Sequence, residues 1–116
     1  MENQPAADLW TNVDLAVTDA VRRLRRRSAG WWRDDAPGDP RLDRASRVAA
    51  LVATLAGYDP AANGRTPPRP VRDETLVDQL RVVAYDLRTV GTDCSADPAE
   101  VAQQIRDCLR DVDPRP

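Results

Sequence analysis

Arginine and tryptophan side chains are concentrated in one stretch of this sequence, and both residue types are suited to binding. The stretch 8–33 contains all three tryptophans of the chain and six of its 17 cationic residues. A guanidinium group binds a carboxylate or a phosphate through parallel hydrogen bonds, and an indole ring packs on apolar surface or stacks on an exposed base. The candidate binding residues are Arg22, Arg25, Arg26, Trp31, Trp32 and Arg33.

These residues favour a protein partner. Trp and Arg are the side chains most enriched at the energetic centres of protein interfaces, and the nearby Asp34, Asp35 and Asp39 add the opposite charge. We therefore predict a non-enzymatic protein-protein interaction module that uses the Arg/Trp end of its first helix. It would be a regulatory or immunity-type partner or a subunit of a larger assembly, and it would bind another protein or form a homo-oligomer.

The alternative is a nucleic-acid-associated factor that binds phosphates through the cluster Arg22–Arg27. Clustered cations contact phosphates, and free aromatic faces stack on bases. However, the chain has a net charge of -2, whereas nucleic-acid-binding domains are usually basic. The neighbouring aspartates would also repel a phosphate backbone. Nucleic-acid binding is therefore our second hypothesis.

The sequence lacks the residue patterns of common catalytic and metal sites. It contains no His, the commonest general base and metal ligand, and no Lys, so Schiff-base chemistry is excluded. It also contains no Gly-rich phosphate loop, CxxC pair or nucleophile elbow. Asp107 and Asp111 have helical spacing, but we interpret them as solvated surface charge. We predict no enzyme activity, catalytic residue, metal site, cofactor or small-molecule substrate.

Length and composition predict one globular domain in the cytoplasm. The 116 residues, 41% hydrophobic and 31% charged, are typical of a single domain. No apolar run approaches the roughly 18 residues that span a bilayer, and the polar start of the chain does not resemble a secretion signal, so we expect no membrane contact. If a helix begins at Asp97, Cys94 and Cys108 cannot meet, and we predict free thiols.

Hydrophobic spacing predicts the helix that carries the candidate residues. We expect a flexible tail over 1–7, a first helix capped by Asp8, and a helix end at Gly30. Its buried stripe contains Trp10, Val13, Ala16, Val17, Ala20, Val21 and Leu24. Asp19 lies three and four residues before two arginines, where weak ion pairs form. Of the adjacent tryptophans, we expect one in the core and the other partly exposed.

Three further helices follow from the same spacing. They are expected over 40–57 after an Asp39 cap, over 73–90, and over 97–112 after an Asp97 cap. Val82 and Tyr85 lie off the buried stripe of the third of the four helices, so they are available to another helix or to a partner. Cys108 falls within the buried stripe of the last helix, where we expect it to pack as a small apolar residue.

The predicted fold is all-α, a four-helix bundle-like single domain over 8–113. No segment alternates with period two for long enough to form a sheet. A long Pro-rich loop over 59–72 separates the second helix from the third, and it leaves room for either an up-down or a crossover topology.

Overall fold

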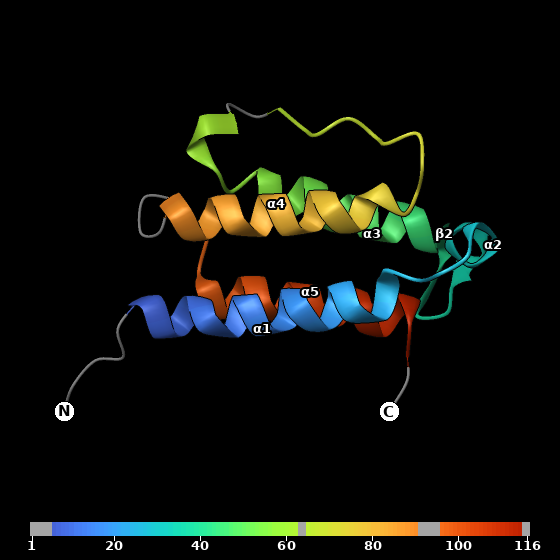
Figure 1. Ribbon diagram of the computed structural model, residues 1–116, viewed down its shortest axis with the longest axis horizontal. Helices are drawn as coiled ribbons and strands as arrows, with labels where there is room; N and C mark the ends of the chain where they lie inside the picture. Colours follow the sequence, from blue (N-terminus) through green and yellow to red (C-terminus); the bar gives the residue numbers. More distant parts are fainter. Residues whose placement is uncertain (1–5, 63–64, 91–95, 115–116) are drawn as a thin grey trace.

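Four long helices lie side by side and enclose the hydrophobic core (Figure 1). The computed structural model describes residues 6–62, 65–90 and 96–114. The long helices are α1 (Ala6–Leu24), α3 (Arg44–Ala56), α4 (Thr75–Val90) and α5 (Pro98–Val112). Helix α1 packs against α4 and α5, and helix α3 packs against the same two helices. The chain is therefore mostly helical and forms one compact domain of 48 × 34 × 23 Å.

Shorter elements connect α1 to α3 at one end of the molecule (Figure 1). They are helix α2 (Ala29–Arg33) and strands β1 (Asp35–Ala36) and β2 (Asp39–Asp43), which pair antiparallel. This small sheet corrects our expectation that no sheet forms. Strand β1 has two residues, too few to give a period-two pattern, so its pairing depends on tertiary contacts.

The first helix ends at Leu24, earlier than the predicted end at Gly30. The reason is a second helix start: the Ser28 hydroxyl accepts a hydrogen bond from the Trp31 backbone N–H at 3.1 Å and so caps α2. Gly30 lies inside this short helix. Consequently Arg25 and Arg26 follow the helix instead of lying in its last turn, and their charges are placed at the turn between α1 and α2.

The second long helix begins at Arg44, four residues after the predicted Pro40, because the residues after Asp39 pair with β1. The cap is Asp43, whose carboxylate accepts the Ser46 backbone N–H at 2.6 Å. A hydrogen bond with the Ser46 side chain is the main cause that lowers the pKa of the Asp43 carboxyl below its usual value, and the backbone N–H of Ser46 lowers it further. The predicted Asp97 cap of α5 is confirmed, because its carboxylate accepts the Ala99 backbone N–H at 3.2 Å.

The connection from α3 to α4 contains a short 3-10 helix, η1 (Pro60–Ala62), and then runs beside α4 (Figure 1). One contact to α4 is a hydrogen bond of 2.9 Å from the Gln79 side chain to the Pro68 carbonyl oxygen. Residues 63–64 of the predicted loop and residues 1–5 of the predicted tail lie outside the described residues. Residues 6 and 7 of that tail belong to α1, so the helix begins before the predicted Asp8 cap. Within the described part, no helix has the length and apolarity needed to cross a membrane.

The core contains side chains from every long helix. Trp10 is buried as predicted, and the side chains with almost no exposed surface also include Trp32, Leu24, Leu55, Leu76, Leu80, Leu87 and Ile105. Cys108 is buried among them with a free thiol, and this burial raises its pKa to about 12. The other cysteine, Cys94, lies outside the described residues, so the prediction that both thiols are free is confirmed for Cys108 alone.

The Cys108 thiol should react only when the protein unfolds. Since burial raises its pKa to about 12, almost no reactive thiolate forms at pH 8.5 in the folded state. We expect iodoacetamide to label Cys108 at least about 100-fold faster in 6 M guanidinium than in buffer, as measured by peptide mass spectrometry. Because the folded state holds this proton more tightly, the thiol contributes stability that is lost as pH rises from about 9 towards 12. Rapid labelling of the folded chain at Cys108 would contradict its burial.

The turn between β1 and β2 docks on the end of α5 through Gly38. Its backbone N–H donates to the Asp111 carbonyl oxygen at 2.8 Å. A Cβ atom at this position would lie 2.7 Å from the Asp111 Cα, which is backbone and cannot rotate away. The close approach therefore requires glycine.

Gly38→Ala should destabilise the fold, because the added methyl group pushes the hairpin away from α5. We expect a loss of about 1–3 kcal/mol in the free energy of unfolding, measured by urea titration of the circular dichroism signal. Gly30→Ala is the matched control, because a Cβ there meets no atom within 4 Å. This control should change stability by less than about 1 kcal/mol, and in the stabilising direction, since Ala favours helix over Gly. Equal effects of the two substitutions would show that the hairpin does not dock on α5 as described.

Candidate binding surface

The Trp31 ring lies in a cluster of aromatic and cationic side chains. The guanidinium carbons of Arg27 and Arg44 lie over the ring, at 4.9 Å and 4.6 Å from its centroid. The Trp32 ring meets it edge-on, with 5.1 Å between the ring centroids and an interplanar angle of 87°. Cation–π and edge-to-face contacts of this kind stabilise each ring in a fixed orientation. The half-buried Trp31 is thus already engaged by groups of its own chain.

Arg44 ties this cluster to the C-terminal end of α5. Its Nε donates to the Val112 carbonyl oxygen at 2.8 Å, and its Nη1 donates to the Trp31 carbonyl oxygen at 3.1 Å. Cations near the last carbonyl groups of a helix interact favourably with its dipole and satisfy acceptors that have no partner within the helix. Arg44 therefore acts as a structural residue that holds three segments together.

Two further arginines bind carboxylates at the same end of α5. Arg27 forms a 2.9 Å ion pair with Asp113, whose residue surface is 6% exposed, and Arg47 forms a 2.9 Å ion pair with Asp111. Removing Arg27 takes the cation away from the buried Asp113 carboxylate, which is destabilising, whereas the Arg47–Asp111 pair is partly exposed and contributes less. These cations thus stabilise the domain and are not free to bind a ligand.

The two candidate tryptophans have different environments. Trp32 is 0% exposed, whereas Trp31 is half-buried, so the prediction of one core ring and one partly exposed ring is confirmed. The Trp32 indole N–H has no hydrogen-bond partner among the described residues, so apolar packing accounts for its burial. Trp32 is therefore corrected from a candidate binding residue to a core residue, because none of its surface is available to a partner.

The candidate arginines remain on the surface. Arg22 forms the predicted ion pair with Asp19 at 2.9 Å, and Arg23 lies 3.6 Å from the same carboxylate. In the part of the chain that the structure describes, Arg25 and Arg26 are exposed and form no ion pair. Surface pairs contribute at most about 1 kcal/mol, so even Arg22 can exchange its partner at little cost.

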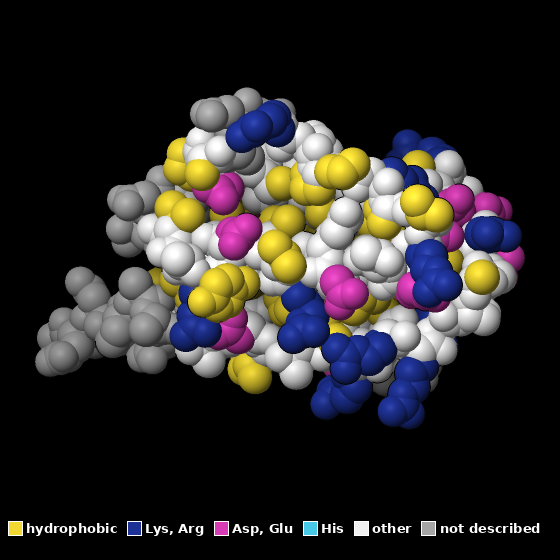
Figure 2. Space-filling view, turned by 45° about the horizontal axis from the view of Figure 1, so that its top comes forward, with side chains coloured by type: hydrophobic (Ala, Val, Ile, Leu, Met, Phe, Trp, Pro, Cys, Tyr) yellow, Lys and Arg dark blue, Asp and Glu magenta, His cyan; other side chains and the backbone are white. Residues whose placement is uncertain are grey.

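Three of the candidate arginines line a groove between α1 and α4 of about 520 Å³. We call it the basic groove; its lining residues are Val17, Thr18, Val21, Arg22, Arg25, Arg26 and Arg81. The lining contains four guanidinium groups and no carboxylate, and Figure 2 shows dark-blue side chains gathered over the C-terminal end of α1. Such a surface attracts anionic groups and offers them several donors at once.

Arg81 is the member of the basic groove that sequence reasoning missed. It lies on α4, far along the chain from the Arg22–Arg27 cluster, and only the packing of α4 against α1 brings the two together. One sequence signal was present, since Arg81 precedes Val82 on the face of α4 that lies off the buried stripe. Conversely, Arg33 ends α2 and does not line the groove, so the structure separates it from the other candidate arginines.

Nothing in the described residues resembles a metal centre. No group of three or more His, Cys, Asp or Glu residues among them could hold a metal ion.

The chain matches no protein-family model, no curated protein and no solved structure. Any functional interpretation of the basic groove therefore depends on its own chemistry.

Arg44→Ala should destabilise the domain, although its position lies outside the hydrophobic core. The substitution removes two hydrogen bonds to carbonyl oxygens and one cation–π contact, so we expect a loss of about 2–4 kcal/mol in the free energy of unfolding. Arg33→Ala is the control, because Arg33 is exposed and forms no ion pair in the described residues, and it should change stability by less than about 0.5 kcal/mol. Thermal and urea unfolding measure both effects. A neutral Arg44→Ala variant would contradict the structural role.

Proposed function

We propose that this protein is a non-enzymatic protein-interaction module, a four-helix bundle that acts in the cytoplasm as a regulatory or immunity-type partner or as a subunit of an assembly. The observation that carries the proposal is the basic groove, where four arginines surround apolar side chains without a carboxylate. Gathering like charges is unfavourable for the isolated domain, and an anionic partner relieves the repulsion. The proposed binding residues are Arg22, Arg25, Arg26 and Arg81.

Support for a protein partner comes from the floor of the groove. Val17 and Val21 of α1 are half-buried and line it below the arginines. Arginines bind carboxylates bidentately, and the apolar floor contacts aliphatic side chains of the same partner. A surface with an apolar centre and a charged rim is the usual anatomy of a protein interface.

The second hypothesis, nucleic-acid binding, has less support from the tryptophans. Single-stranded nucleic acids bind through cations together with aromatic faces on which bases stack. Trp32 offers no exposed face, and the Trp31 ring lies against two guanidinium groups of its own chain. The valine floor of the basic groove also has no favourable contact with a phosphate backbone.

Charge reversal in the basic groove tests the proposal. We expect Arg25→Glu combined with Arg26→Glu to weaken partner binding at least about 10-fold, because repulsion replaces attraction to carboxylates. The matched control is Arg33→Glu combined with Arg106→Glu. It changes the net charge equally at two exposed positions outside the groove, neither of which forms an ion pair in the described residues. This control should bind as the wild type does.

The measurement has two stages. Immobilised wild-type protein first captures proteins from cytoplasmic extract, and each captured protein is then purified and titrated calorimetrically against the wild type and both variants. A labelled single-stranded oligonucleotide is titrated in parallel at low and high salt. The proposal fails if no purified protein binds or if both double variants bind equally well. Steeply salt-dependent oligonucleotide binding that is lost only in the groove variant would instead support the second hypothesis.

A further inference from the structure

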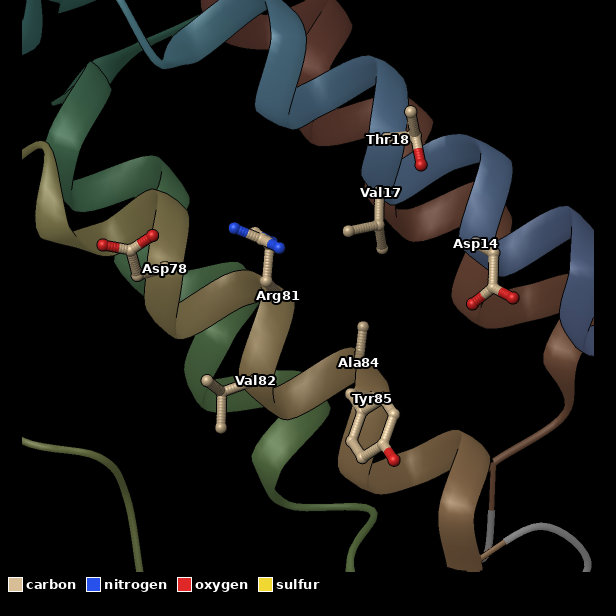
Figure 3. Close-up of a pocket in the computed structure, with 8 residues that line it drawn as sticks. All are labelled: Asp14, Val17, Thr18, Asp78, Arg81, Val82, Ala84 and Tyr85. Carbon is tan, nitrogen blue, oxygen red and sulfur yellow. The ribbon is translucent and has the colours of Figure 1, made fainter.

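The basic groove continues along the seam between α1 and α4 into a second hollow of about 530 Å³ (Figure 3). The two hollows share Val17, Thr18 and Arg81. The remaining lining residues of the second hollow are Asp14, Asp78, Val82, Ala84 and Tyr85. Together they form one channel, which we call the seam groove, with the arginine cluster at one end.

The second hollow presents apolar surface that the domain itself does not cover. Val82 is 58% exposed and Tyr85 is 68% exposed, and the two lie nearly one turn apart on α4. Figure 3 shows Val17 of α1 and Ala84 of α4 pointing into the space between the two helices. Large exposed apolar side chains beside a groove with an apolar floor mark an interaction site.

We propose that the seam groove binds an amphipathic α-helix of a partner protein, with the acidic side chains of that helix at the arginine end. This inference depends on the proposed function and specifies the partner. Asp14 on α1 and Arg25, the first residue after α1, mark the two ends of the groove, and eleven residues at about 1.5 Å per residue give a length of roughly 16 Å. That length accommodates about three turns of a helix, whose apolar residues at spacings of three and four follow the groove.

Charge sets the direction of the proposed helix. At one end Asp14 is paired with Arg88, so this end is locally neutral. Asp78 lies ten residues before Arg88 on α4, on the far side of Arg81 from Asp14 (Figure 3). It forms no ion pair in the described residues and offsets part of the positive charge near the arginine end, where four guanidinium groups outnumber it. The four guanidinium groups at the other end attract carboxylates. The acidic residues of the partner should therefore cluster at a single end of its helix.

A second copy of this chain is a poorer occupant. In a two-fold dimer the same surface lies on both sides of the interface. The seam groove is lined by four arginines and two carboxylates, and one of these carboxylates, Asp14, is already paired with Arg88, so a second copy would offer only Asp78 to the four arginines. An added strand is also excluded, because α1 and α4 use their backbone groups within their helices.

A peptide display library tests the inference and does not require the partner itself. Helix-forming peptides of about 16 residues with randomised surface positions are selected on the wild-type protein. We expect the enriched peptides to combine an apolar stripe at helical spacing with Asp or Glu at one end. Tyr85→Asp should weaken these peptides at least about 10-fold, because it places a charge on the apolar wall.

The control is Leu15→Asp, which places the same charge at another exposed apolar position, 61% exposed, on α1 outside the groove. It should bind the selected peptides as the wild type does, and both variants should keep the melting temperature of the wild type. Peptides weakened by Arg25→Glu with Arg26→Glu but not by Tyr85→Asp would overturn the helix-in-groove inference and leave the proposed function intact. Failure to enrich any peptide, enrichment of basic peptides, or a dimer in sedimentation that Tyr85→Asp dissociates would also overturn it.

Discussion

The end of α5 is the constraint on which this corner of the structure depends. A helix terminus leaves carbonyl groups without partners inside the helix, and here the following Asp113 adds a buried carboxylate. Other segments supply the missing donors: the Gly38 backbone N–H and the side chains of Arg27 and Arg44. These donors come from the turn after α1, from the hairpin and from the start of α3. One helix end thus determines how three connecting segments are arranged.

This constraint separates two groups of arginines that look alike in the sequence. Arg27 and Arg44 face α5, and each combines an ion pair or carbonyl contact with a place over the Trp31 ring. Arg25 and Arg26 turn away from that cluster and reach the groove beside α4. Neighbours in sequence therefore differ in role because the turn after Leu24 points successive side chains in different directions. Of these four arginines, only Arg25 and Arg26 line the basic groove.

Local patterns located the long helices but not all of their ends, since α1 ends at Leu24 and α3 begins at Arg44. Periodic apolar positions and the Asp97 cap predicted four long helical segments, and Asp19 lay at the spacing that forms its observed ion pairs. The hairpin was not predictable, because a two-residue strand has no period and its turn is held by a contact with α5 over 70 residues away. For the same reason Arg81 was not predicted as a binding residue. Its place in the groove follows from the packing of α4 on α1, which no pattern within either helix encodes.

The pairing of α1 with α5 also bears on how the chain acquires its structure during synthesis. These two helices form an extensive contact, although 73 residues separate Leu24 from Pro98. At roughly 5–20 residues per second, a ribosome takes several seconds to make that interval. During this time α5 is not yet available to pack against Trp10 and the rest of the apolar face of α1. The nascent chain therefore exposes this face until α5 emerges, so a chaperone that shields apolar helices would act on α1 before the domain closes.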